Sequence, residues 1–352
     1  MKIRIYLYLL LLLCCPSVLA QETPPLPLRE GQGEGSSSTP VRKTRSGMLI
    51  IGRGNSVRAV SPFSGGRDRG IAYAEAVNRY YETFGDRVNI YCMVIPTAVA
   101  FYCPDEALQW TQDQPDAVRH IYNHLAEKVI PITLFDTLQA HVQEPIYSRT
   151  DHHWAPLGAY YAARAFAAAA EVPFADLSTY DAHVVHDYVG TMYKFSRDIA
   201  VRNAPEDFVY YTPRDIYYDC TYIRYTLGRG RKDVIAQTDE LVEQPFFYDY
   251  PDGSSNAYLC FMHGDDCVCW VRTGTHNGRR LLILKDSFGN ALPGYLFHSF
   301  EEICVVDCRY FTTNMVDFVT IHHITDILFA NNISHAYSPA TAEKYHVYLE
   351  QK

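Results

Sequence analysis

Asp151, His152, His153 and Trp154 bring a carboxylate, two imidazoles and an indole together in consecutive residues. In an extended segment, residues two apart point to the same side, so Asp151 can hydrogen-bond His153 and fix its tautomer. A carboxylate that orients an imidazole supplies two groups of a nucleophile–base–acid triad. Because isolated D-x-H triplets are common by chance, a structural His–Trp cluster at the start of a buried helix is the competing interpretation.

Ser287, in the stretch 281–290, is the predicted nucleophile. An apolar run ends at Lys285 and Asp286, and a Gly-Asn turn follows Phe288. This pattern places the serine at the carboxyl end of a strand, just before a helix, with its hydroxyl exposed above the edge of the sheet. The amides of Ser287 and Phe288 would then point toward a developing oxyanion. Serine is also a favoured N-cap, so an Asp-Ser pair alone would carry little weight.

The same histidines allow a second chemistry, a metal site made by Asp151, His152 and His153. Adjacent histidines do not easily converge on one ion, and no further ligand cluster accompanies them. We therefore expect no metal and no cofactor. His152 falls on the opposite side of the extended segment, where packing or a backbone hydrogen bond is its expected role.

The N-terminus predicts export. Two basic residues precede an apolar run that is too short to span a bilayer, and small residues lead up to Ala20. We expect residues 1–20 to be a signal peptide, cleaved after Ala20, which leaves a periplasmic or extracellular protein with no membrane span. Cys14 and Cys15 would suit a lipoprotein, but large leucines precede them.

Net charge and cysteine content limit the partners and the covalent cross-links that the chain can have. A net charge of -9 without a basic cluster argues against nucleic acid as a partner. Two of the ten cysteines fall in the signal, and the remaining even number permits disulfides in an oxidising compartment. Neither the Cys267–Cys269 pair nor the Cys304–Cys308 pair has zinc-type spacing. Buried thiols, or one or two disulfides, are therefore expected.

Strand and helix patterns alternate in the part of the chain that must position these residues. Residues 21–46 are rich in Pro, Gly and Ser and predict a flexible linker. The folded part is expected at 47–335. Its first half predicts a strand at 48–52, a helix at 71–84, a strand at 88–95, a helix at 117–129, a strand at 130–135 and a helix at 155–170. This order predicts an α/β fold with a parallel sheet and helices on both faces.

The alternation breaks at 172–275, which we interpret as a Tyr-rich, antiparallel β insertion rather than a separate domain. Its tyrosines are expected in core and edge packing, or on a face that stacks sugars: Tyr210, Tyr211, Tyr217, Tyr218, Tyr222 and Tyr225. The alternation then returns, with strands at 267–271, 281–284, 303–306 and 326–330 and helices at 288–300 and 315–324. Residues 336–352 are expected to form a C-terminal tail.

Asp-His-His-Trp at 151–154 with Lys-Asp-Ser-Phe at 285–288 resembles the DHHW protein family. That family is related to the SGNH-like acetyltransferase domains of alginate O-acetylation proteins. In ordinary SGNH hydrolases the Gly-Asp-Ser strand comes first and an Asp-x-x-His loop comes last, whereas here the order is reversed. The resemblance implies a circularly permuted, flavodoxin-like fold. Lys285 in place of glycine, and D-x-H in place of D-x-x-H, both suit the DHHW pattern.

The resemblance also implies an O-acetyltransferase or esterase that acts on a polysaccharide or oligosaccharide, and it allows a membrane partner that donates the acyl group. Phe288, with Asn331 or Asn332, would hold the oxyanion. Arg309 would position a sugar carboxylate or the ester oxygen, or form a surface ion pair. The alternative is a non-catalytic carbohydrate-binding or surface-assembly protein, in which Ser287 is buried or the His153 imidazole is turned away.

Overall fold

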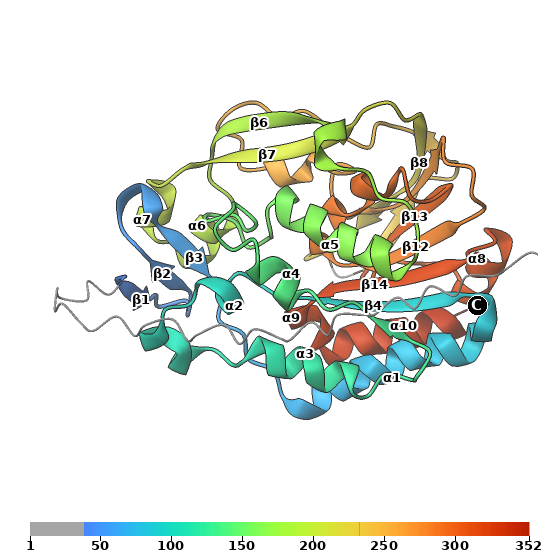
Figure 1. Ribbon diagram of the computed structural model, residues 1–352, viewed down its shortest axis with the longest axis horizontal. Coiled ribbons are helices and arrows are strands. Elements are labelled where there is room, and N and C mark those ends of the chain that lie inside the picture. The colour runs from blue at the N-terminus through green and yellow to red at the C-terminus, as the bar shows by residue number, and fades with distance from the viewer. Residues whose placement is uncertain (1–38, 232, 352) are drawn as a thin grey trace, which may run out of the picture. The chain divides into compact units, whose positions relative to one another are not determined.

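The computed structural model describes residues 39–231 and 233–351 (Figure 1). The predicted signal peptide and residues 21–38 of the predicted linker lie outside the described residues. Within the linker range, however, β1 (Val41–Lys43) pairs with β2 (Leu49–Ile51), which in turn pairs with β3 (Arg58–Val60). The folded part therefore includes residues before 47, because backbone pairing with the apolar β2 holds the β1 segment.

A nine-stranded mixed sheet forms the centre of the fold. Five of its strands run parallel and lie in the spatial order β13–β12–β14–β4–β5. They are β4 (Asn89–Ile95), β5 (Ile130–Pro131), β12 (Arg280–Lys285), β13 (Glu302–Asp307) and β14 (Asp326–Asn332). The central strands β12 and β14 are buried along nearly their whole length, as near-continuous apolar runs in a parallel sheet must be.

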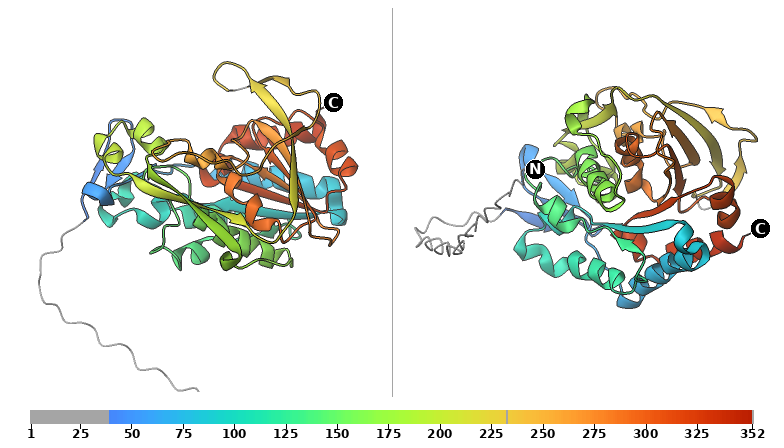
Figure 2. Two further views of the ribbon diagram at one scale, coloured as in Figure 1. Left: turned by 90° about the horizontal axis from the view of Figure 1, so that it is seen from above. Right: turned by 45° about the vertical axis from the view of Figure 1, so that its right-hand side comes forward.

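The other four strands extend this sheet in antiparallel fashion, and all of them fall within the range 172–275. They are β8 (Tyr218–Leu227), β9 (Val234–Gln237), β10 (Val242–Glu243) and β11 (Cys267–Thr273). β11 pairs with β13 on one side and with β8 on the other. Residues 274–279 join β11 to β12, and they are too few for the crossover that parallel strands need. The β8–β9 hairpin, drawn in yellow in Figure 2, extends beyond the sheet.

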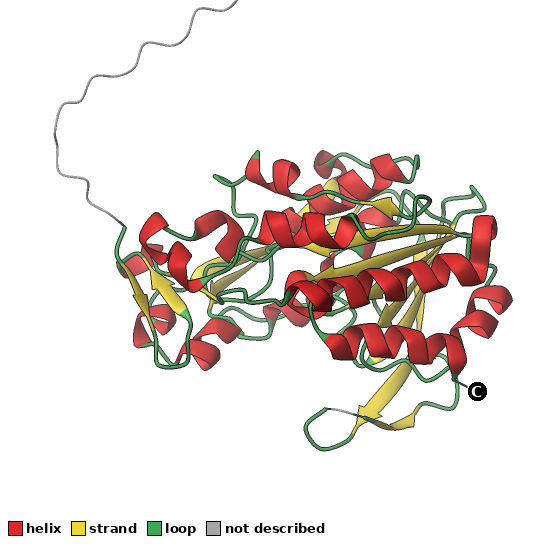
Figure 3. Cartoon of the chain, turned by 90° about the horizontal axis from the view of Figure 1, so that it is seen from below, coloured by secondary structure: helices red, strands yellow, loops and turns green. Residues whose placement is uncertain are grey.

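Helices cover both faces of the parallel strands. On one face, α1 (Arg67–Phe84) packs between α3 (Gln114–Tyr122) and α10 (Pro339–Glu350), as the red helices of Figure 3 show. On the other lies α5 (Pro156–Ala169), with α4 (Phe135–Gln139) against it (Figure 1). The shorter helices are α2 (Val99–Tyr102), α6 (Thr191–Ser196), α7 (Ile199–Arg202), α8 (Met315–Ile321) and α9 (Ile333–Ala336).

Two expected elements differ in the structure. The tail expected at 336–352 is largely α10, because Tyr345 and Tyr348 bury their rings in the core. The helix expected at 288–300 is replaced by two buried 3-10 helices, η6 (Ser287–Ala291) and η7 (Pro293–Leu296). Pro293 has no backbone N–H to donate to a preceding turn, which disfavours a continuous α-helix across it.

The tyrosines of the 172–275 region mainly build the core. Tyr210, Tyr222 and Tyr225 are buried, whereas Tyr217 is 68% exposed. Besides the strands that this region adds to the central sheet, β6 (Tyr180–Tyr188) and β7 (Glu206–Pro213) form a separate antiparallel pair. Core packing is therefore the main role of these rings, and Tyr217 alone among the six is fully at the surface.

The described cysteines are all free thiols, and all but Cys103 are buried. Of the two alternatives left open by the sequence, the structure therefore has buried thiols. None of the helices in the described ranges is both long enough and apolar enough to cross a membrane.

Candidate active site

Asp151, His153 and Ser287 form a continuous hydrogen-bonded row. Asp151 Oδ1 lies 2.6 Å from His153 Nδ1, and His153 Nε2 lies 2.8 Å from Ser287 Oγ. Asp151 and His153 are buried, while Ser287 is partly exposed. The structure thus brings together a carboxylate, an imidazole and an accessible hydroxyl in the order that nucleophilic catalysis uses.

A tight loop, rather than an extended segment, presents Asp151 and His153. A β-bridge between Tyr147 and Trp154 closes this loop, and residues 149–153 are bent. Asp151 Oδ1 also accepts the backbone N–H of His153 at 3.0 Å. The predicted contact therefore exists, but the bend produces it, and the expectation of an extended backbone was wrong.

The bend also changes the position of His152. Its ring lies 3.7 Å from the ring of His153 instead of on the opposite side, and its Nδ1 lies 2.6 Å from Thr191 Oγ1. Burial lowers the pKa of His152 to about 3, with a further contribution from the neighbouring His153. We infer that His152 is a neutral side chain at the edge of the site.

Two residues from the 172–275 region hold the loop in place. Thr191 donates its backbone N–H and its hydroxyl to Asp151 Oδ2, both at 2.8 Å. Glu206 accepts the backbone N–H groups of Arg149 and Thr150 and the Thr150 hydroxyl. Neither residue could be predicted from the sequence, because no local pattern links Thr191 or Glu206 to a loop that lies 40 to 57 positions away.

The nucleophile turn is tied to the same loop by two aromatic side chains. Trp154 Nε1 donates to the Phe288 carbonyl at 2.9 Å. Tyr258 donates its hydroxyl to the carbonyls of Ser287 and Phe288, both at 3.0 Å. The Tyr258 ring also stacks on His153 with a centroid distance of 3.8 Å. These contacts fix the Ser287 backbone and limit rotation of the His153 imidazole. No pattern in the sequence predicted this role for Tyr258.

The predicted oxyanion donors are only partly free. The Phe288 amide donates to Asp286 Oδ1 at 2.9 Å, so this expected donor is already used. Asn331 is fully buried, and its Oδ1 accepts the hydroxyls of Tyr73 and Tyr345, both at 2.7 Å. Asn331 therefore serves the core, because its side chain lies between α1 and α10.

Asn332 is the asparagine that reaches the pocket beside Ser287. Its Oδ1 caps α9 by accepting the amides of Ser334 and His335, and its own amide donates to Asp286. Neither the Asn332 Nδ2 nor the Ser287 amide has a hydrogen-bond acceptor within the described chain. These two groups are therefore free to donate to an oxyanion.

The pocket beside Ser287 has a volume of about 270 Å³. It lies where several strands of the sheet end, which is the usual position of binding sites in open α/β folds. Its lining includes Val60, Ser61, Thr97, His152, Arg309 and Asn332.

A buried charge network supports the floor of this pocket. Lys285 lies 2.9 Å from Asp307 and 3.3 Å from Asp265. Arg309 pairs with the same two carboxylates, at 2.6 Å and 2.9 Å, and Asn290 donates to Asp265. Arg309 is therefore ion-paired and also lines the pocket, and its Nη1 has no hydrogen-bond partner in the described residues.

Asp151, His152 and His153 could also approach a metal ion, since one ligand atom of each lies within 4.8 Å of the others. The expectation that adjacent histidines would not converge was wrong, because the bend turns both rings to one side. The ring nitrogens nevertheless have protein partners: His153 contacts Asp151 and Ser287, and His152 Nδ1 contacts Thr191. The arrangement suits an acid–base relay better than a metal centre.

Burial by itself would raise the pKa of Asp151, but the adjacent His153 and the hydrogen bonds to the carboxylate hold that pKa well below its usual range. Asp151 therefore stays ionised, as a group that stabilises an imidazolium must. Burial would likewise raise the pKa values of Asp265 and Asp307, but Lys285 and Arg309 lower both.

Acid is expected to destabilise the fold through these carboxylates. Groups whose pKa is lower in the folded state stabilise it above their unfolded pKa of about 3.9, and this stability is lost as the pH falls toward the folded value. The free energy of unfolding should therefore change little from pH 7 to pH 5 and fall below about pH 4. Urea unfolding at successive pH values measures it. Acidification should lower the free energy of unfolding of an Asp265→Asn variant less than that of the parent protein. An equal decrease in the two proteins would contradict the role of the network.

Gly190 is required by its contact with the catalytic loop. A Cβ at this position would overlap the Asp151 carboxylate and lie 2.7 Å from the Tyr188 hydroxyl. Gly190→Ala should therefore lower the free energy of unfolding by about 1–3 kcal/mol, as measured by urea unfolding. Gly274→Ala is the matched control, because a Cβ there meets only ordinary contacts of 3.6 Å or more. Equal effects of the two substitutions would argue against a tight contact at Asp151.

Comparisons with known proteins agree with this architecture. Residues 54–306 match the model of the family described as DHHW protein. A DHHW family protein from Eubacterium siraeum DSM 15702 shares 38% sequence identity at a TM-score of 0.78, over 88% of this chain and 97% of that chain. Bacillus cereus PatB1 with a sulfonyl adduct has a similar fold at 17% identity and a TM-score of 0.62, over 86% of this chain and 97% of that chain. No curated protein sequence matches the chain.

Proposed function

The chain belongs to the DHHW protein family, and from this premise we propose that it is an exported acyltransferase or esterase that acts on acetyl groups of a polysaccharide. Ser287 is the nucleophile, His153 the general base and Asp151 the residue that orients and stabilises the imidazole. The predicted signal at 1–20 supports a periplasmic or extracellular location.

The observation that carries this proposal is the 2.8 Å distance between His153 Nε2 and Ser287 Oγ. A general base must lie within hydrogen-bond reach of the proton that it removes. The partial exposure of Ser287 at the pocket gives a substrate access to the hydroxyl. Both features favour catalysis over the alternative of a binding protein that retains the fold without turnover.

In the first half-reaction, Ser287 Oγ attacks the carbonyl carbon of an acetyl ester while His153 Nε2 accepts the hydroxyl proton. The carbonyl oxygen becomes an oxyanion, for which the Ser287 amide and the Asn332 side-chain amide are the available donors. Collapse of this intermediate breaks the ester bond. The departing alcohol takes the proton from His153, and the acetyl group remains on Ser287.

In the second half-reaction, a hydroxyl attacks the acetyl carbonyl and gives its proton to His153, which returns the proton to Ser287. A sugar hydroxyl makes the protein a transferase, and water makes it an esterase. The Nη1 group of Arg309 is placed to hold a sugar carboxylate or the ester oxygen, because the rest of its guanidinium is fixed by Asp265 and Asp307.

We also infer that the sheet is a circular permutation of the flavodoxin-like order. Counting begins at β12, the strand before the nucleophile, and continues through β13, β14, β4 and β5. The spatial order β13–β12–β14–β4–β5 then reads 2-1-3-4-5, which is the flavodoxin order. The Tyr-rich region 172–275 is, in this description, the insertion that adds the antiparallel strands.

Incubation of the full chain with 4-nitrophenyl acetate and a panel of oligosaccharides tests the proposal. We expect nitrophenol release, an acetylated Ser287 peptide by mass spectrometry and, for a transferase, acetylated oligosaccharide. Hydrolysis without sugar acetylation would identify an esterase. A sulfonyl fluoride should label the same peptide, since PatB1 has been solved with a sulfonyl adduct. Absence of both nitrophenol release and acyl-Ser287 would overturn the proposal.

A further inference from the structure

A second concave site lies on the antiparallel part of the sheet, away from Ser287. It is a groove of about 850 Å³, larger than the pocket of about 270 Å³ at Ser287. Its floor includes Arg280 and Leu281, at the opposite end of β12 from the nucleophile. At about 3.3 Å per residue, the strand separates the two sites by about 20 Å. The groove is therefore not an extension of the active site.

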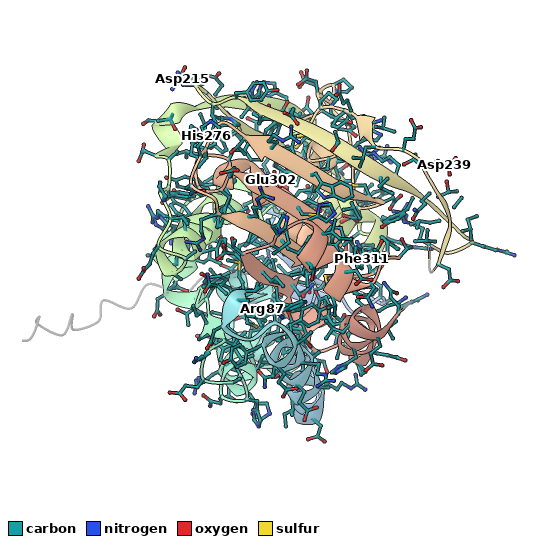
Figure 4. All side chains as sticks on the ribbon, turned by 90° about the vertical axis from the view of Figure 1, so that its right-hand side faces the viewer. Arg87, Asp215, Asp239, His276, Glu302 and Phe311 are labelled. Atoms are coloured by element: carbon teal, nitrogen blue, oxygen red, sulfur yellow. The ribbon has the colours of Figure 1, made fainter. Side chains whose placement is uncertain are left out.

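Four charged residues cross the floor of this groove in register. Arg272 on β11 is paired with Asp219 on β8 and with Glu302 on β13, and Glu302 is paired with Arg280 on β12. Their signs alternate across four neighbouring strands. Figure 4 looks onto this side of the sheet, with Glu302 labelled near its middle. Strands lie about 4.8 Å apart, so this charge ladder is about 14 Å wide.

The ladder is only weakly paired within the protein. Arg272 is exposed and makes no hydrogen bond or ion pair with any described residue. Arg280 makes only long contacts, at 3.8 Å to Glu302, 3.9 Å to Glu301 and 3.4 Å to the His322 carbonyl. Large apolar or aromatic side chains stand at its rim: Tyr217 is 68% exposed, Ile321 is 69% exposed and Leu241 is 56% exposed. Donors, acceptors and apolar surfaces thus lie next to one another.

We propose that this groove binds a neutral glycan strand at a site separate from Ser287. Two positive and two negative side chains balance within the ladder, and Glu243 on β10 adds a third carboxylate to the groove lining, so the groove does not favour an anionic ligand. Sugar hydroxyls both donate and accept, so they can satisfy guanidinium and carboxylate groups side by side. The exposed Tyr217 ring gives an apolar face for a sugar ring, with its hydroxyl held by Asp219 at 3.0 Å.

A protein partner fits this surface less well. The centre of a protein interface is depleted in charged residues, and covering four charges with apolar side chains would leave them without partners. A glycan replaces the lost water with hydroxyl groups. Retention of a polymer at this site would raise the effective concentration of its other segments around the protein. The groove proposal stands on these contacts alone and does not depend on the chemistry at Ser287.

The tryptophan indoles report on the two sites separately. The chain has three tryptophans, of which Trp270 lines the groove and Trp154 donates to the nucleophile turn. The Trp270 indole N–H has no hydrogen-bond partner among the described residues. Its signal in a two-dimensional ¹H–¹⁵N NMR spectrum should therefore respond to changes around it. The resonance is assigned by its disappearance in Trp270→Phe. Titration uses the full-length Ser287→Ala protein, with cellohexaose, xylohexaose and an oligogalacturonate as probes.

We expect a saturable shift of the Trp270 signal with at least one neutral hexaose, while the Trp154 signal moves less. Arg272→Ser should weaken binding by about 10-fold, since it removes charge-assisted hydrogen bonds. Arg229→Ser, at an exposed position outside the groove, should bind as the parent does. No saturable shift with either neutral hexaose, tighter binding of the oligogalacturonate, or equal affinity in Arg272→Ser would overturn the proposal. So would a Trp270 shift that depends only on protein concentration, because a second copy would then fill the groove.

Discussion

Ser287→Ala is expected to reduce turnover of an acetyl ester by about 10⁴-fold or more, because residues of a triad act as a unit and loss of the nucleophile removes the covalent route. The residual rate would come from the oxyanion donors and substrate binding. The substitution removes one hydroxyl from a partly exposed side chain, so the free energy of unfolding should change by about 0.5 kcal/mol or less. Steady-state kinetics with 4-nitrophenyl acetate, beside urea unfolding, measures both.

Ser334→Ala provides the matched control for this loss. Ser334 lines the same pocket and is exposed, but its hydroxyl forms no hydrogen bond with the described residues. We expect its variant to keep activity within about threefold of the parent, as for a substitution away from the reacting atoms. His153→Gln should lose about as much as Ser287→Ala, and the double variant little more than either. Equal turnover by the parent and Ser287→Ala would end the nucleophile assignment.

Asp307→Asn is expected to lower the free energy of unfolding by about 3–5 kcal/mol, since it leaves two buried cations, Lys285 and Arg309, with Asp265 as their remaining carboxylate. Asp307 is 1% exposed, and it contacts both the Lys285 ammonium and the Arg309 guanidinium. Asparagine has nearly the same shape, so the loss would come from charge and not from packing. Urea unfolding at pH 7 measures it.

A double-mutant cycle separates the charge effect from the shape effect. Lys285→Met combined with Asp307→Asn removes both the buried ammonium and its nearest carboxylate, so the pair should cost less than the sum of the single changes by about 1–3 kcal/mol. Asp116→Asn is the exposed control, because both Asp116 and its partner Arg119 are about 65% exposed, and it should cost less than about 0.5 kcal/mol. Additive effects of the two buried changes would show that the network does not stabilise the fold as a unit.

Some of the site follows from short stretches of sequence. The apolar run before Asp286 forms β12, and Ser287 follows at its carboxyl end. The alternation of strands and helices anticipates the parallel core. These features are local, because a strand pattern and the residue that ends the strand depend only on residues a few positions apart. The Asp151–His153 contact is also local, although the bend that makes it was not foreseen.

Other features depend on the rest of the chain. The Phe288 amide was an expected oxyanion donor, but the neighbouring Asp286 uses it. The choice between Asn331 and Asn332 depends on two tyrosine hydroxyls, from α1 and α10, that hold Asn331 in the core. A strand gives successive side chains opposite directions, but it does not say which direction faces the core. Packing of the helices makes that choice.

By itself, then, the sequence determined the chemical groups, their two short neighbourhoods and the α/β alternation, because these depend on residues close together in the chain. Only the tertiary structure decided that His153 meets Ser287 across 134 positions, that Tyr258 and Thr191 support them, and that β11 reverses direction beside β13. Such contacts arise when distant segments bury their apolar faces in one core, so no single segment carries the information that places them.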